Sequence, residues 1–261
     1  MCRAKLRFLV TAGVGFFADG YLNLTIGLVV PILGYLYFED NQGQVPAVQS
    51  DVIKGSLSLG MVVGQLLFGV LSDLWGRHTI YGKELILTMF GTLMVILLPW
   101  KNMSASGVTT WISVFRVVTG IGIGAEKSPF ASRAVQVLTV FSNIGLGNIA
   151  ASIVFLILLK AFQGAIASDQ NNLEWIWRLL LGIGIVPAAL TLYARLTISE
   201  TEPYKQYVCN DPAGHSRGWK EQWADFREYF GEWRHSKVLF ATAASWFLLY
   251  APNQFSKPRD L

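Results

Sequence analysis

Long apolar runs separated by short polar segments dominate the pattern along the chain. A helix that spans the hydrocarbon core of a bilayer needs about 20 mostly apolar residues. Six runs are long enough: residues 8–37, 53–71, 80–100, a fourth from near 108, 137–162 and 175–198. A seventh run, 238–252, is too short to span. The pattern therefore predicts an all-α transmembrane fold, a six-helix bundle with an incomplete seventh helix.

Three regions follow from this pattern. Residues 1–198 form the predicted N-terminal transmembrane bundle, 199–237 a cytoplasmic linker, and 238–261 the truncated seventh helix with its tail. Within the linker, aromatic residues recur at nearly a helical period over 219–236, with charges between them. This spacing predicts an amphipathic helix that lies at the membrane interface.

The composition supports the membrane assignment. Hydrophobic residues make up 52% of the chain and charged residues 15%, whereas a soluble domain usually carries about 25% charged residues. The Lys and Arg residues concentrate at the N-terminus, in the loop after the second span and in the linker. By the positive-inside bias, we expect a multi-pass protein with a cytoplasmic N-terminus. The expected location is the plasma membrane, which the bias itself does not determine. The cations form no single patch, so nucleic-acid binding is not expected.

Glycine residues mark the second predicted span. Gly60 and Gly64 are spaced so that another helix backbone can approach closely. A pattern of glycine, acid and base then follows at the predicted cytoplasmic end of the span. It consists of Gly69, Asp73, Gly76 and Arg77. An acid and a base on such a tight turn can hold neighbouring helices together and release them, so we interpret the pattern as a conformational latch; the alternative is a solvated loop.

Ionisable side chains occur inside the predicted spans, where they are energetically costly and often functional. Asp19 lies in the middle of the first span, Glu84 near the start of the third, and Glu126 at the end of the fourth, which also holds Arg116. Because burial raises the pKa of a carboxyl group, such acids can exchange protons near neutral pH. We interpret the three acids as proton-coupling residues; the alternative is that acid–arginine pairs only hold the bundle together.

Neutral polar groups in the spans suit an oxyanion, because they donate hydrogen bonds without fully neutralising it. The candidates for substrate binding are Tyr21, Asn23, Asn143, Asn148 and Trp246, together with the cationic Arg116. A packing role is the alternative for each aromatic residue. Residues 143–148 also form a small-residue face with polar edges.

Several motifs together resemble one family. The segment 69–77 resembles the signature between the second and third helices of the major facilitator superfamily. Segments 81–85 and 115–126 resemble its phosphate:proton symporter family, and 18–23 is similar to the fungal glycerophosphoinositol and glycerophosphodiester permeases. The resemblance covers nearly the whole chain, and the first half of a family member with the start of its second half. It implies alternating access and places Asp19, Glu84 and Glu126 on the proton route.

The chain departs from the family pattern near the end of the fourth span. Where the family has a tyrosine after the acid, this chain has Lys127, which we include as a substrate-binding candidate that supplies a charge. Only residues 132–136 remain for the turn to the fifth span, fewer than in family members. A deleted segment, such as a mispredicted exon, is our hypothesis for this short connection.

The sequence thus predicts a proton-coupled secondary transporter of phosphate or of a glycerophosphodiester such as glycerophosphoinositol. Its partners would be these substrates, protons and the lipid bilayer, and no cofactor is expected. An enzyme is not expected, because no metal-ligand or nucleophile–base spacing appears. The alternative is a truncated membrane fragment that does not transport.

Overall fold

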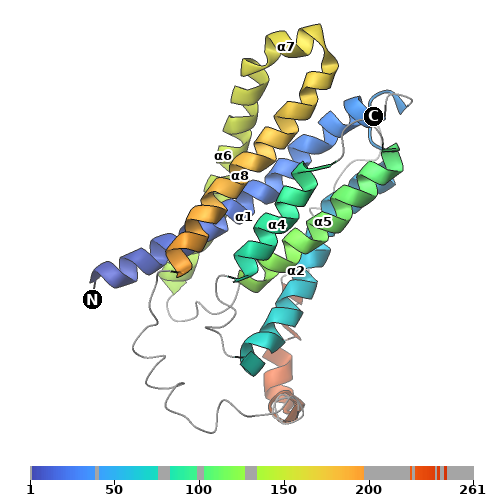
Figure 1. The fold of residues 1–261 in the computed structure, drawn as a ribbon. Coiled ribbons are helices and arrows are strands. Elements are labelled where there is room, and N and C mark those ends of the chain that lie inside the picture. Colours follow the sequence, from blue (N-terminus) through green and yellow to red (C-terminus); the bar gives the residue numbers. More distant parts are fainter. Residues whose placement is uncertain are drawn as a thin grey trace. The chain divides into compact units, whose positions relative to one another are not determined.

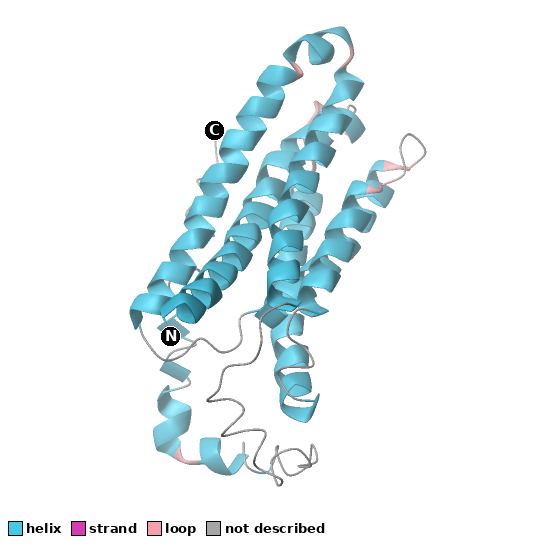
Figure 2. Ribbon diagram, turned by 60° about the vertical axis from the view of Figure 1, so that its left-hand side comes forward, coloured by secondary structure: helices cyan, strands magenta, loops and turns pink. Residues whose placement is uncertain are grey.

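A computed structural model describes residues 2–38, 41–75, 83–98, 103–126 and 134–196, and part of the C-terminal region, namely 224, 227–238, 240–241 and 244–245. The regular elements within these ranges are all helical (Figure 2). Contacts divide the chain into two units, Met1–Glu202 and Pro203–Leu261, which are described separately.

The first unit consists of long helices joined by short connections (Figure 1). A short helix, α7, and a 3-10 turn, η2, connect α6 to α8. The elements are α1 (Cys2–Tyr37), α2 (Ala47–Trp75), α4 (Lys83–Ile96), α5 (Ala105–Glu126), α6 (Ala134–Ala161), α7 (Gln163–Ser168), η2 (Gln170–Asn172) and α8 (Leu173–Leu196).

Five of these helices are long and apolar enough to cross a membrane, and α4 is a shorter apolar helix. The five spans lie within α1, α2, α5, α6 and α8. They coincide with the first, second, fourth, fifth and sixth apolar runs of the sequence, and α4 lies within the third run. The all-α transmembrane prediction is therefore confirmed, with five to six spanning helices.

Glycine residues let α2 and α5 pack backbone against backbone. The two helices run in the same direction and form the most extensive helix pair of the unit. A Cβ atom added at Gly60 would overlap the Val117 carbonyl of α5, and one at Gly64 would overlap the Ile121 carbonyl. The prediction that Gly60 and Gly64 allow close helix approach is confirmed.

A second glycine contact joins α1 to α6. A Cβ atom at Gly20 would overlap the Ile144 carbonyl, and one at Gly147 would overlap the Phe17 carbonyl. Gly147 lies within the small-residue face expected at 143–148. In lipid, where apolar burial gives little driving force between helices, such close approach supplies the van der Waals contact that holds them together.

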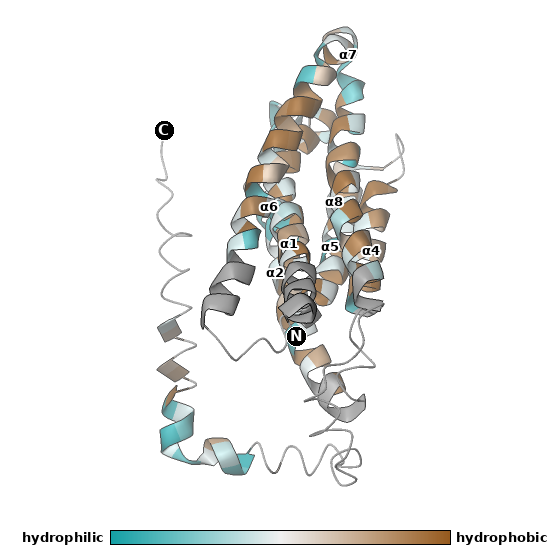
Figure 3. Ribbon diagram, turned by 90° about the vertical axis from the view of Figure 1, so that its left-hand side faces the viewer, coloured by the Kyte–Doolittle hydropathy of each residue, from teal (hydrophilic) through white to brown (hydrophobic). Residues whose placement is uncertain are grey.

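The apolar core lies between α1, α4, α5 and α8. Its fully buried side chains include Leu33, Leu98, Ile112, Trp177 and Leu180. By contrast, α2 and α6 bury little of their spanning segments, 28% and 11% respectively. Their exposed residues include many large apolar side chains, among them Leu59, Val63 and Leu66 of α2 and Ile149, Ile153 and Leu156 of α6. Much of the α6 ribbon accordingly has the colour of hydrophobic residues (Figure 3).

The described part of the second unit is also helical, with a bend at Glu232. The ring of Tyr229 stacks on that of His235, with 4.0 Å between centroids, and Trp233 is 79% exposed. This region overlaps the predicted amphipathic helix over 219–236. Its position at a membrane interface remains a prediction, as does the division of the chain into three regions.

Candidate functional site

The candidate residues of α1 point to different surroundings. Asp19 is buried, with 9% exposure, whereas Asn23 is exposed on the same face, because residues four apart share one side of a helix. Tyr21 lies elsewhere around α1 and its hydroxyl donates a 2.9 Å hydrogen bond to the Leu180 carbonyl of α8. The Tyr21 hydroxyl therefore donates its hydrogen bond to α8, which favours a packing role for this residue over substrate binding.

Glu84 lies in the first turn of α4 and is almost completely buried, with 2% exposure. The close approach of α5 causes this burial, since a Cβ atom at Gly122 would lie 2.6 Å from the Glu84 carbonyl oxygen. Ionisable side chains inside a spanning bundle are costly and often functional, so Glu84 remains a candidate functional residue.

Arg116 is buried inside the bundle, with 3% exposure. Its Nε donates a 3.2 Å hydrogen bond to the Ile53 carbonyl of α2, while its Nη2 is buried without a partner among the described residues. Arg116 forms no ion pair within the described part of the chain. The alternative in which Arg116 pairs with an acid to hold the bundle together is therefore not supported there.

The structure separates Glu84 from Arg116 along the bundle axis. Glu84 packs beside Gly122, six residues after Arg116 on α5, which corresponds to a rise of about 9 Å. Thr88 and Thr92 continue along α4 from Glu84, and each hydroxyl donates to the carbonyl four residues earlier. The acid and the cation thus occupy different levels of the α4–α5 contact.

The asparagine candidates lie on α6. The side chain of Asn143 faces α1, because a Cβ atom at Gly13 would lie 3.0 Å from its Nδ2. Asn148 is partly buried, and its carbonyl accepts a 3.2 Å hydrogen bond from the Ser152 hydroxyl. Asn143 is therefore placed at the α1–α6 contact, and neither asparagine is shown to meet the Arg116 region.

Several candidates lie where the structure gives no account of them. Gly69 is on an exposed part of α2 where an added Cβ atom would meet open space. Asp73 and Glu126 belong to α2 and α5, but their side chains fall outside the description, as do Gly76, Arg77, Lys127 and Trp246 entirely. The predicted latch and these substrate contacts remain predictions.

The end of the bundle at which α1 ends is here called the Tyr37 end. It holds a polar cluster that sequence reasoning missed. Arg178 of α8 pairs with Glu174 at 2.9 Å and donates to the carbonyls of Leu98, at 2.8 Å, and Ile96 at the end of α4. The Tyr37 hydroxyl of α1 also donates to Glu174. The i, i+4 spacing of Glu174 and Arg178 was the signal available in the sequence.

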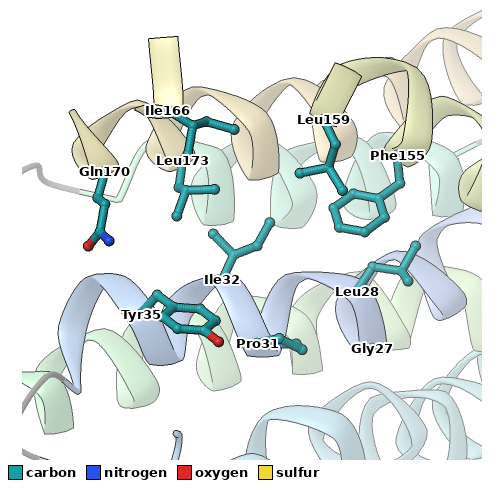
Figure 4. Close-up of a pocket in the computed structure, with 10 residues that line it drawn as sticks. All are labelled: Gly27, Leu28, Pro31, Ile32, Tyr35, Phe155, Leu159, Ile166, Gln170 and Leu173. Atoms are coloured by element: carbon teal, nitrogen blue, oxygen red, sulfur yellow. The ribbon is translucent and has the colours of Figure 1, made fainter. Parts of the chain in front are cut away.

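A groove of about 400 Å³ opens at the same end between α1, α6 and the α7–α8 region (Figure 4). Its lining is hydrocarbon apart from the Tyr35 hydroxyl and the Gln170 amide. A phosphate group needs several donors or cations, so this groove does not fit an anionic substrate. Groups of three or more His, Cys, Asp or Glu able to hold a metal do not occur in the described residues.

A bundle of spanning helices with buried acids and a buried cation is typical of membrane transporters. The sugar (and other) transporter family matches residues 8–238, and the chain belongs to this family. It is a transporter-family protein and not an enzyme, as predicted.

Several similar proteins are named as phosphate transporters. The chain is 30% identical to the inorganic phosphate transporter PHO84 of Saccharomyces cerevisiae, over 94% of this chain and 50% of that protein. It is 30% identical to the repressible high-affinity phosphate permease of Neurospora crassa, over 94% of this chain and 51% of that protein. Inorganic phosphate transporter 1-1 of Oryza sativa is 31% identical over 95% of this chain and 56% of that protein.

The chain spans about half the length of these relatives. The alignment with PHO84 extends over 301 positions, more than the 261 residues of this chain, so the relative has additional residues within the aligned region.

Solved structures show the same fold. A partially occluded, inward-open structure of the xylose transporter XylE from E. coli aligns with a TM-score of 0.61 and 17% identity, over 95% of this chain and 60% of that chain. A XylE structure with a bound bromo-deoxyglucose, described as a major facilitator superfamily protein, aligns with a TM-score of 0.62 over 77% of this chain. The fold is therefore that of the N-terminal half of a major facilitator transporter.

Proposed function

We propose that this chain is the N-terminal half of a proton-coupled phosphate transporter that works by alternating access. The burial of Asp19 and Glu84 within spanning helices carries the proposal, because acids in such positions can bind protons while the bundle moves. Phosphate is the favoured substrate, since the similar proteins described above are named as phosphate transporters. Proton binding would offset the negative charge of the incoming anion.

The exposed apolar side chains of α2 and α6 support the proposal that this chain is one half of a transporter. These helices bury less of their spanning segments than α1, α5 or α8 do. In our proposal a second helical bundle packs against them, and the two bundles rock about a site near the middle of the membrane. The plasma membrane and a cytoplasmic N-terminus are part of the same proposal.

Uptake measurements test this function directly. The chain would be expressed in a yeast strain that lacks phosphate uptake, alone and together with the C-terminal half of PHO84. We expect labelled phosphate uptake from the pair, faster at low external pH because protons enter with the anion, and none from the chain alone. Labelled glycerophosphoinositol would be supplied in parallel, and preferential uptake of it would assign that substrate instead.

Two results would contradict the proposal. Uptake by the pair that is indifferent to pH would remove proton coupling. Absence of uptake, when both halves reach the membrane and purify together, would favour the second reading, a truncated membrane fragment that does not transport. This second interpretation is supported by the observation that the chain matches only about half the length of its relatives.

A further inference from the structure

Arg116 lines a small, partly open cavity between four helices. The cavity measures about 10 Å³ and is bounded by Leu22 of α1, Thr92 and Val95 of α4, Arg116 and Thr119 of α5, and Leu181 of α8. A single buried water needs about 10–15 Å³ and two to four polar partners. The cavity is therefore of the size for one water and is too small for a phosphate.

The bonds already made around the cavity define which chemistry it accepts. The hydroxyl protons of Thr92 and Thr119 are donated to the carbonyls of Thr88 and Phe115, at 2.8 and 3.0 Å. Each hydroxyl oxygen can therefore only accept a hydrogen bond from a group in the cavity and cannot donate one to it. An anion would meet these acceptors unfavourably, whereas a water can donate to them.

Arg116 supplies the complementary donor. Its Nε is bonded to the Ile53 carbonyl, and Nη2 is the nitrogen that is buried without a partner among the described residues. A buried guanidinium nitrogen that makes no hydrogen bond is strongly destabilising. A water in the cavity would accept from Nη2 and donate to both threonine oxygens, and so make the three hydrogen bonds typical of a buried water.

We propose that this cavity is a structural water site, in which one water joins Arg116 of α5 to Thr92 of α4. Arg116 then links α5 to α2 through the Ile53 carbonyl and to α4 through the water. In this arrangement the guanidinium acts as a positioning group within the half-bundle and does not contact substrate. The inference rests on the bundle itself and stands whether or not the chain transports phosphate.

A cavity-filling substitution tests the water. Val95→Ile adds one methylene group at the cavity wall, in the full chain purified into lipid nanodiscs. If water occupies the cavity, its displacement leaves Nη2 without a partner, and we expect the apparent melting temperature to fall by about 2–4 °C. A rise in melting temperature would show a dry cavity that is stabilised by filling, and would overturn the proposal.

The Arg116→Met background separates water displacement from simple crowding. With no guanidinium to satisfy, Val95→Ile should cost much less than it does in the unaltered chain. An equal cost in both backgrounds would indicate crowding and contradict the proposal.

A threonine pair provides a test that does not need Arg116→Met to fold. Thr92→Val should lower the melting temperature more than Thr25→Val, because both residues are buried and bond the carbonyl four residues earlier, but only Thr92 lines the cavity. Equal effects would count against the water. Exchange of chloride for gluconate in the buffer should leave the melting temperature unchanged. A melting temperature that depends on the halide would show that an anion occupies the cavity in place of the water.

Direct observation completes the test. In an experimental structure that resolves other buried waters, we expect a density peak about 2.7–3.2 Å from Arg116 Nη2 and from the two threonine oxygens. A cavity without such a peak at that resolution would overturn the assignment.

Discussion

At the scale of single residues, several ionisable side chains are removed from water inside the first unit, among them three candidates from the sequence. Asp19, Glu84 and Arg116 are exposed by 9%, 2% and 3%. Burial of such groups is costly and is maintained where it serves a function or where a partner compensates. Arg116 has a carbonyl partner in α2, at Ile53.

Asp19→Asn tests the role of the α1 carboxyl group. The amide has nearly the same shape but cannot exchange a proton, so we predict that most of the pH-driven phosphate uptake by the paired halves is lost. Asp51→Asn is the matched control, because Asp51 is an exposed carboxylate on α2. Uptake that is unchanged by Asp19→Asn would exclude a proton role for this residue.

At the scale of helices, close backbone contact replaces the hydrophobic effect as the organising force. Gly60 and Gly64 bring α2 onto α5, and Gly20 and Gly147 bring α1 onto α6. The polar cluster at the Tyr37 end adds a different kind of connection, since Arg178 covers carbonyl groups at the end of α4 that have no partner within that helix.

Alanine substitutions at two glycines of α2 should have opposite effects. Alanine favours a helix by about 1 kcal/mol over glycine, and at Gly55 an added Cβ atom meets open space. Gly64→Ala instead forces α5 away from α2, and we predict destabilisation of about 1–3 kcal/mol. The comparison of melting temperatures in nanodiscs checks this; equal values for Gly55→Ala and Gly64→Ala would show that α2 and α5 do not pack as described.

Arg178→Met should destabilise the Tyr37 end strongly. The substitution leaves Glu174, which is 3% exposed, buried without its cation, and loss of one member of a buried pair costs about 3–5 kcal/mol. Addition of Glu174→Gln should recover part of the loss, because the buried negative charge is then removed. Lys160→Met, at an exposed cation of α6, is the control. No recovery in the double variant would contradict the pairing.

At the scale of the whole molecule, the apolar surface is distributed unequally. The spanning segments of α2 and α6 are 28% and 11% buried, compared with 61% for α1 and 56% for α5. The helices that bury the acids are thus central in this unit. The less buried helices present the faces that a second bundle would cover.

Photo-crosslinking tests this arrangement. A benzoyl-phenylalanine placed at Leu66 of α2 or Leu156 of α6, both exposed, should crosslink to the C-terminal half of PHO84 when the two halves are expressed together. The same probe at Leu190 of α8, also exposed, should not. Crosslinks from Leu190 alone would place the second bundle on the other side of the unit.

Much of the fold follows from local chemistry. An apolar run of about 20 residues has few alternatives to a spanning helix, so the helices lie where the apolar pattern predicts them. The spacing of Gly60 and Gly64 likewise indicated a close helix contact, because a missing side chain is a local property. The motifs that resembled major facilitator transporters are consistent with the family to which the chain belongs.

The candidate site was predictable only in part. The sequence by itself determined which residues are costly in a membrane, namely Asp19, Glu84 and Arg116, because their chemistry does not depend on neighbours. The tertiary structure decided which contacts the polar side chains make. Arg116 donates to the Ile53 carbonyl and Tyr21 to the Leu180 carbonyl. Tyr37, Glu174 and Arg178 come together in one cluster. The contacts of Arg116, Tyr37 and Tyr21 join residues that are 63 to 159 positions apart in the sequence. The rotation of each helix against its partners, which no local pattern encodes, sets these contacts.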